Sequence, residues 1–89
     1  MSRSQRIREI LSQAFDPIEL DVIDESHLHA GHAGARPEGE THFRLHIVAS
    51  TFETMTRVQR HRAVMRALQT EFDAGLHALA IAAEIPSPA

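Results

Sequence analysis

The chain has 89 residues, which is enough for one domain and too few for two. It contains no cysteine, so disulfides, a thiol nucleophile and thiolate metal ligands of its own are excluded. The formal net charge of -3 argues against indiscriminate nucleic-acid binding, and no apolar run approaches the ~20 residues of a membrane span. We therefore expect a single domain over residues 1–89, cytoplasmic by default and away from membranes, whose seven histidines are its distinctive feature.

A first helix is predicted over residues 3–15. Ser2 and Gln5 have the spacing of a capping box, and apolar residues then recur at helical intervals. Asp16 and Pro17 should end this helix, because the residue before a proline is driven out of the α region.

Two strands separated by a long loop should follow. The first covers residues 18–24, where Ile18 opens an alternation of apolar and polar side chains. The second starts at Thr41 and is expected to pair antiparallel with the first. One of its faces carries Phe43, Leu45 and Ile47, and the other, expected to meet solvent or cover part of a helix, carries His42, Arg44 and His46. The loop at residues 25–40 has neither period, and loops longer than about 12 residues are usually functional or disordered.

A second long helix is expected over residues 57–72. Thr56 and Gln59 form another capping-box pair. The apolar stripe of this helix contains Val58, Met65, Leu68 and Phe72. A short helical turn should precede the helix at residues 52–56, and Gly75 suits a left-handed exit after it.

The last part of the chain completes an α+β domain. Residues 76–85 form a nearly continuous apolar run, which predicts a third strand buried on both faces. Residues 86–89 are expected to be a tail. The elements therefore follow the order α-β-β-α-β, with an ordered core over residues 3–85.

Histidines provide the first candidate site. His27, His29 and His32 lie close together in the loop, and imidazole is a common metal ligand. Without cysteine or a nearby acidic partner they make an incomplete site, because a structural zinc ion usually has four ligands. The alternative is a solvated loop whose histidines merely titrate. His77, at the start of the third strand, is either a hydrogen-bonded strand residue or a ligand that a loop histidine joins.

A basic segment provides the second candidate site. It consists of Arg57, Arg60, His61, Arg62 and Arg66, and no acidic residue lies between Arg57 and Thr70. On a helix these side chains would bind phosphate groups or form an ordinary solvated face. The sequence lacks a nucleophile elbow, a phosphate-binding glycine loop and an H-E-x-x-H pair. We therefore expect no enzymatic activity and no small-molecule substrate.

Five short motifs, taken in chain order, resemble those of the BolA family. They are D-E-S-H at 24–27, H-A-G-H-A-G at 29–34, E-T-H-F at 40–43, R-H-R at 60–62 and H-A-L-A-I at 77–81. Each motif is weak alone, and the five in this order and at these separations are a specific signature. The resemblance implies a small α+β domain similar to a class II KH domain. Its three-stranded sheet would have helices on one face and a short extra helix before the second long one.

The resemblance also implies a function. Proteins of this family are partners of monothiol glutaredoxins and can share a [2Fe-2S] cluster with them, in iron-sulfur trafficking or iron and stress regulation. The glutaredoxin cysteine and glutathione would hold one side of the cluster. On this chain His77 would be one ligand, and the other would be His32, which we prefer, or His29. His27, His42 and His46 receive no role.

A second function is implied for the basic segment. Some bacterial members of the family are described as transcriptional regulators that read DNA through the helical region around the R-H-R motif. The alternative function is therefore binding of promoter DNA through Arg57, Arg60, His61, Arg62 and Arg66. The net charge of -3 predicts weak affinity for a monomer, and binding should weaken steeply as salt rises.

Overall fold

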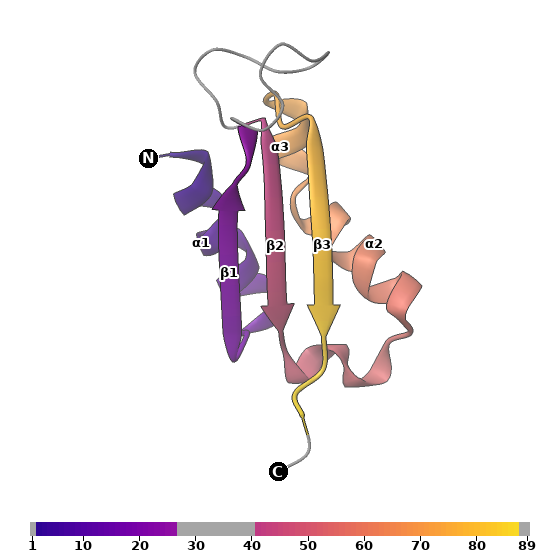
Figure 1. Ribbon diagram of the computed structural model, residues 1–89. Coiled ribbons are helices and arrows are strands. Elements are labelled where there is room, and N and C mark those ends of the chain that lie inside the picture. The colour runs from indigo at the N-terminus through magenta and orange to yellow at the C-terminus, as the bar shows by residue number, and fades with distance from the viewer. Residues whose placement is uncertain (1, 27–40, 88–89) are drawn as a thin grey trace.

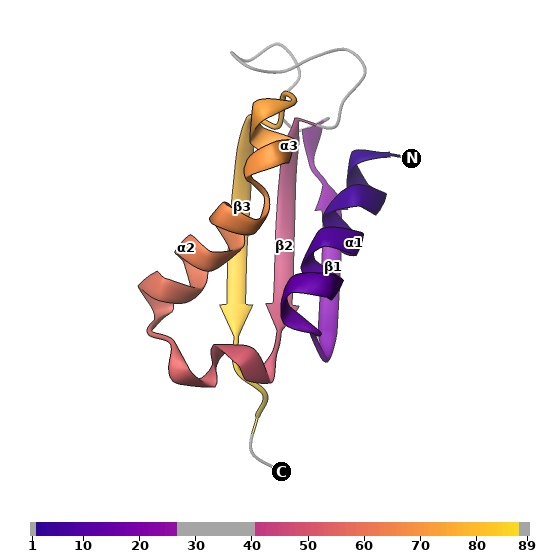
Figure 2. The ribbon, with the colours of Figure 1, turned by 180° about the vertical axis from the view of Figure 1, so that it is seen from behind.

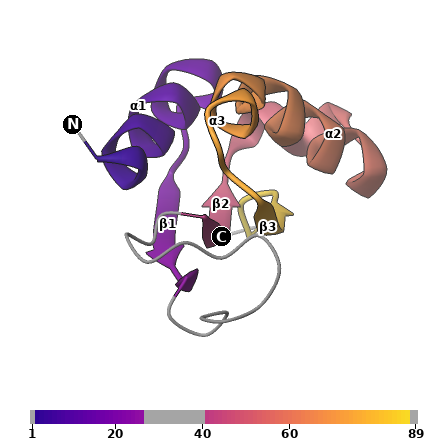
Figure 3. The same cartoon turned by 90° about the horizontal axis from the view of Figure 1, so that it is seen from above.

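The structure is a computed structural model that describes residues 2–26 and 41–87. Its helices are α1 (Arg3–Phe15), the 3₁₀ helix η2 (Ser50–Thr54), α2 (Arg57–Ala67) and α3 (Gln69–Asp73), and its strands are β1 (Glu19–Asp24), β2 (His42–Val48) and β3 (Ala78–Glu84). The strands form one sheet in the order β1-β2-β3 (Figure 1). α1, α2 and α3 all lie on one side of this sheet (Figure 3). The predicted α+β architecture is confirmed.

β2 is the central strand of a mixed sheet. It pairs antiparallel with β1, as predicted, and parallel with β3. Phe43 lies opposite Asp24, and His42 lies opposite Ala78. The end of β1 and the starts of β2 and β3 therefore meet at one end of the sheet, which is the upper end in Figure 1.

The core lies between the sheet and the helices. Its buried side chains include Ile7, Leu11, Phe15, Phe43, Leu45, Ile47, Phe52, Val64 and Leu68. Each fully buried side chain of this size contributes about 1.5–3 kcal/mol relative to its exposed state. Among the described residues, no helix has the length and hydropathy needed to span a membrane.

α1 has the predicted bounds and the predicted capping box. The Ser2 hydroxyl accepts a hydrogen bond from the Gln5 amide at 3.1 Å, and the Ser2 amide donates to Gln5 Oε1 at 2.8 Å. The helix ends at Asp16, which takes a left-handed conformation with φ of 47°. Ile18, predicted as the first residue of a strand, is 66% exposed, because the chain still bends there and β1 begins only at the next residue.

The predicted helix over residues 57–72 is two helices. α2 ends at Leu68, where φ and ψ are -100° and 14°, and α3 begins directly afterwards. The expected apolar stripe is also partly wrong, because Val58 is 57% exposed and Val64 is buried instead. Val58 belongs to the first turn of α2, which extends past β3 in Figure 2. Gly75 has a φ of 120°, the positive value predicted for it.

Two further predictions need correction. The short helical turn comes two residues earlier than expected, as η2, and it buries Phe52 completely. β3 is shorter than residues 76–85, and it is not buried on both faces. Ala78, Ala80 and Ala82 are exposed while the intervening residues are partly buried, because the helices cover only one face of the sheet.

Candidate functional site

His77 lies at the end of the sheet where the long loop joins it. Its side chain is exposed, and it directly precedes β3. The His77 amide donates a hydrogen bond to the Thr41 carbonyl at 2.8 Å, and the Ala78 amide donates to the same oxygen at 3.1 Å. The backbone of His77 is therefore fixed to the residue that follows the loop, while its imidazole stays accessible.

His42 occupies a different environment from the solvent-facing one predicted for it. The residue is only 6% exposed, and its ring centroid is 5.1 Å from that of His77, at an interplanar angle of 50°. A hydrogen bond of 2.9 Å joins His42 Nδ1 and Thr41 Oγ1. The alternation of β2 correctly placed His42 on the face opposite the core. It did not reveal the contact with His77, which depends on the parallel pairing of β2 with β3.

Ser26 and Thr41 hold the two ends of the loop together. The Ser26 hydroxyl accepts hydrogen bonds from the Thr41 amide at 2.9 Å and the His42 amide at 3.1 Å. The Ser26 amide donates to Asp24 Oδ1 at 2.9 Å. Ser26 and Thr41 are both buried. Asp24, Ser26, Thr41 and His42 thus form one hydrogen-bonded closure beside His77, a role that sequence reasoning had missed.

The other predicted histidine ligands lie outside the described residues. These are His29 and His32, together with His27, which had no assigned role. In residues 2–26 and 41–87, no group of three or more histidine, aspartate or glutamate side chains is arranged to hold a metal ion. Among the described residues, His77 therefore offers one exposed imidazole at this end of the sheet, which could serve as one ligand of a metal.

His46 lies farther along the open face of the sheet, between two carboxylates. Its Nε2 is 3.4 Å from Glu84 Oε2 on β3, and its Nδ1 is 3.5 Å from Asp21 Oδ2 on β1. The hydrogen bond with Glu84, and then that with Asp21, raises the pKa of His46 above 6.5 against the opposing effect of burial. This residue is partly exposed, in agreement with the predicted solvent-facing position.

The basic segment lies on α2, as predicted, and its arginines are not equivalent. Arg60 Nε donates to the Met55 carbonyl at 3.2 Å, so this side chain also secures the start of the helix. Arg57, Arg62 and Arg66 have no ion pair or side-chain hydrogen bond within the described part of the chain. Because Arg3, Arg6 and Arg44 pair with carboxylates, most of the unpaired arginine charge of residues 2–26 and 41–87 lies on α2. Arg8 on α1, which donates to the Leu20 carbonyl at 3.3 Å, is the exception.

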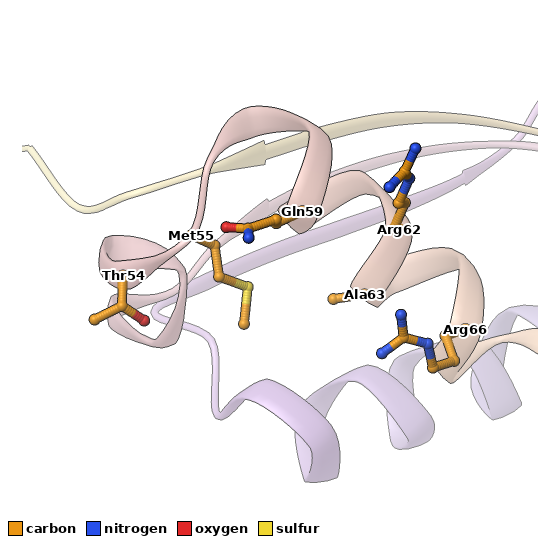
Figure 4. Close-up of a pocket in the computed structure, with 6 residues that line it drawn as sticks. All are labelled: Thr54, Met55, Gln59, Arg62, Ala63 and Arg66. Carbon is orange, nitrogen blue, oxygen red and sulfur yellow. The ribbon is translucent and has the colours of Figure 1, made fainter.

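A groove of about 400 Å³ runs along this helix. It is lined by Thr54, Met55, Gln59, Arg62, Ala63 and Arg66 (Figure 4). The guanidinium groups of Arg62 and Arg66 point in different directions, and that of Arg66 lies toward Ala63. The surface therefore offers separated cations rather than a single enclosed anion pocket.

Comparison with known proteins identifies the class of domain. Residues 11–87 match the family of BolA-like proteins. SufE-like protein 1 from Arabidopsis thaliana, named as chloroplastic or mitochondrial, is 49% identical over 90 residues, which cover 97% of this chain and 24% of that protein. Protein BOLA1 from Arabidopsis thaliana, named as chloroplastic, is 48% identical over 88 residues, which cover 97% of this chain and 55% of that protein. The chain thus spans about a quarter and about half of the length of these two relatives.

A solved structure agrees with this match. BolA1 from Arabidopsis thaliana superposes with a TM-score of 0.87 at 46% identity, over 99% of this chain and 98% of that one. Fold and sequence together define a small α+β domain with an accessible histidine at the start of its last strand. The chain belongs to the BolA family. The names of the two plant relatives refer to organelles, so the cytoplasmic location stays a prediction for this chain.

Proposed function

We propose that this protein is a non-enzymatic partner of a monothiol glutaredoxin, with which it shares a [2Fe-2S] cluster. On this chain the ligands would be His77 and one loop histidine, His32 in preference to His29. The observation that carries the proposal is the exposed imidazole of His77, which lies beside the hydrogen-bonded residues Ser26 and Thr41. The His77 amide donates to the Thr41 carbonyl at 2.8 Å, which fixes the backbone beneath this imidazole.

The chemistry of the donor set supports a shared cluster. The chain has no thiolate to offer, and the described residues contain no complete metal site. A cluster held by cysteine sulfur on one iron and imidazole on the other supplies one-electron chemistry at a raised reduction potential. His77 would hold its side of such a group at the surface, where a second protein has access. The cluster would then belong to the complex, in iron-sulfur trafficking or iron and stress regulation.

Visible absorption and circular dichroism test this proposal. The protein is mixed with a cluster-loaded monothiol glutaredoxin, and the wild type should change both spectra. His77→Ala should abolish the change, and the separate His32→Ala and His29→Ala variants should show which loop histidine participates. His46→Ala is the matched control, because His46 lies on the same sheet at a distance from His77 along the strands. A His77→Ala spectrum identical to that of the wild type would contradict the ligand assignment.

A second candidate function is binding of promoter DNA through α2. It is supported by the three arginines of this helix that have no partner among the described residues, Arg57, Arg62 and Arg66. Neutralised phosphates release counterions, so the logarithm of the binding constant should fall with the logarithm of salt by about 0.9 per phosphate contacted.

A promoter fragment titrated at several salt concentrations tests this second function. Replacing Arg62 and Arg66 by glutamine should weaken binding and reduce the slope by about 0.9 for each lost contact. Arg44→Gln is the control, because Arg44 already pairs with Glu25 at 3.1 Å. Binding that is independent of salt, or equally strong in the double variant, would remove this function.

A further inference from the structure

We infer that His42 is a positioning residue that fixes the orientation of the His77 imidazole for binding a metal. The inference rests on the proposed function, because it concerns the same ligand. It assigns a role to the histidine of the E-T-H-F motif, for which the sequence suggested none.

His42 is itself held rigidly. Its amide donates to the Ser26 hydroxyl at 3.1 Å, and its carbonyl accepts from the Glu25 amide at 2.8 Å. Its ring is tied through Nδ1 to Thr41 Oγ1 at 2.9 Å, and the residue is only 6% exposed. A buried ring with these attachments has little freedom to rotate.

His77 is the exposed member of the pair, and Thr41 connects the two. The Thr41 carbonyl holds the His77 backbone at 2.8 Å, while the Thr41 hydroxyl holds the His42 ring. The centroids of the two rings are 5.1 Å apart, within the range of favourable aromatic contact. Thr41 thus fixes both the backbone of His77 and the ring of His42 that contacts the His77 imidazole.

This arrangement favours positioning over ligation by His42. A metal at the surface reaches an exposed imidazole directly, whereas His42 would have to leave its buried place and its bond to Thr41. Residues behind a metal ligand commonly orient it, and their loss typically weakens metal affinity by about 10–100-fold. We therefore expect His42 to act through the rotamer of His77.

Two substitutions separate these roles. His42→Phe keeps a ring beside His77 and removes both ring nitrogens, whereas His42→Ala removes the ring. In the protein without metal, the side-chain couplings of His77, measured by NMR, should stay close to the wild type in His42→Phe. They should show rotamer averaging in His42→Ala. The mixed complex with cluster-loaded glutaredoxin should be retained by His42→Phe and weakened by about 10-fold or more in His42→Ala.

Controls keep this test independent of folding and of the proposed function. If His42→Ala does not fold, His42→Val removes the ring while keeping a β-branched side chain suited to a strand, and the same averaging of His77 is expected. Loss of the complex in a folded His42→Phe, to the extent seen for His77→Ala, would make His42 a ligand and overturn the inference. Wild-type behaviour of a folded His42→Ala would also overturn it. Failure of the wild type itself to alter the glutaredoxin spectrum would instead remove the proposed function, and the NMR result would still decide whether His42 orders His77.

Discussion

The imidazole of His46 shows how a single residue can make stability depend on pH. It lies within 3.4 Å of Glu84 and 3.5 Å of Asp21, and these hydrogen bonds raise its pKa above 6.5. A pKa that is higher in the folded state means that protonation favours folding. The resulting stabilisation is complete below pH 6.5 and disappears as pH rises through the folded pKa.

His46→Gln should therefore destabilise the protein in acid and not in alkali. Because the His46 side chain is 37% exposed, solvent screening limits the loss to less than about 1 kcal/mol near pH 5.5. Denaturant unfolding of both proteins at about pH 5.5 and about pH 9 measures the difference, and the comparison cancels the titration of other groups. An equal or larger loss at the alkaline pH would contradict this account.

Residue-level prediction from the sequence succeeded where local pattern was sufficient. His77 was placed correctly at the start of the last strand, and His46 was placed correctly on the open face. His42 was misjudged because it contacts Ser26 and His77, which are distant from it in sequence. No periodicity within β2 carries that information.

At the scale of elements, α1 and α3 are joined by a small ionic cluster. Glu71 is 5% exposed, and its two carboxylate oxygens accept from Arg6 Nε at 3.0 Å and Arg3 Nε at 3.1 Å. The Arg6 hydrogen bond, followed by that of Arg3, lowers the pKa of Glu71 below 4.5 against the opposing effect of burial. The break after α2 places α3 where this carboxylate meets the first turns of α1.

Glu71→Gln should lower the free energy of unfolding by about 1–3 kcal/mol at neutral pH, because it weakens hydrogen bonds to charged groups in a buried place. A folded pKa below 4.5 gives stability that is present above that pH and is lost as pH falls through the folded value. The loss measured by denaturant unfolding should therefore shrink in strong acid. Glu53→Gln, at an exposed position on η2, is the control and should change stability by no more than about 0.5 kcal/mol. A loss of unfolding free energy in Glu71→Gln as small as that of the control would contradict a stabilising role for this ionic cluster.

The elements themselves were predictable to different degrees. Both capping boxes have the predicted hydrogen bonds, because such caps depend on residues three apart. The division between α2 and α3 was not predictable from apolar spacing, since it serves the distant contact of Glu71 with α1. The faces of β3 were indistinguishable because alanine occupies both of them.

At the scale of the whole molecule, the fold leaves one face of the sheet open and brings the loop ends to His77. The helices cover the opposite face, and the start of β3, which His77 directly precedes, lies at the other end of the sheet from the first turn of α2 (Figures 1 and 2). The described residues provide no complete metal site, which makes a partner part of the proposed function. A net charge of -3 likewise leaves DNA binding dependent on the local charge of α2.

The central claim is that this chain joins a cluster held by a monothiol glutaredoxin, and one titration tests it most directly. Increasing amounts of the wild-type protein are added to the cluster-loaded glutaredoxin while visible circular dichroism is recorded. The account predicts a new spectrum that saturates at one chain of this protein per glutaredoxin chain and that His77→Ala does not produce. A glutaredoxin spectrum that stays unchanged at every ratio would contradict it.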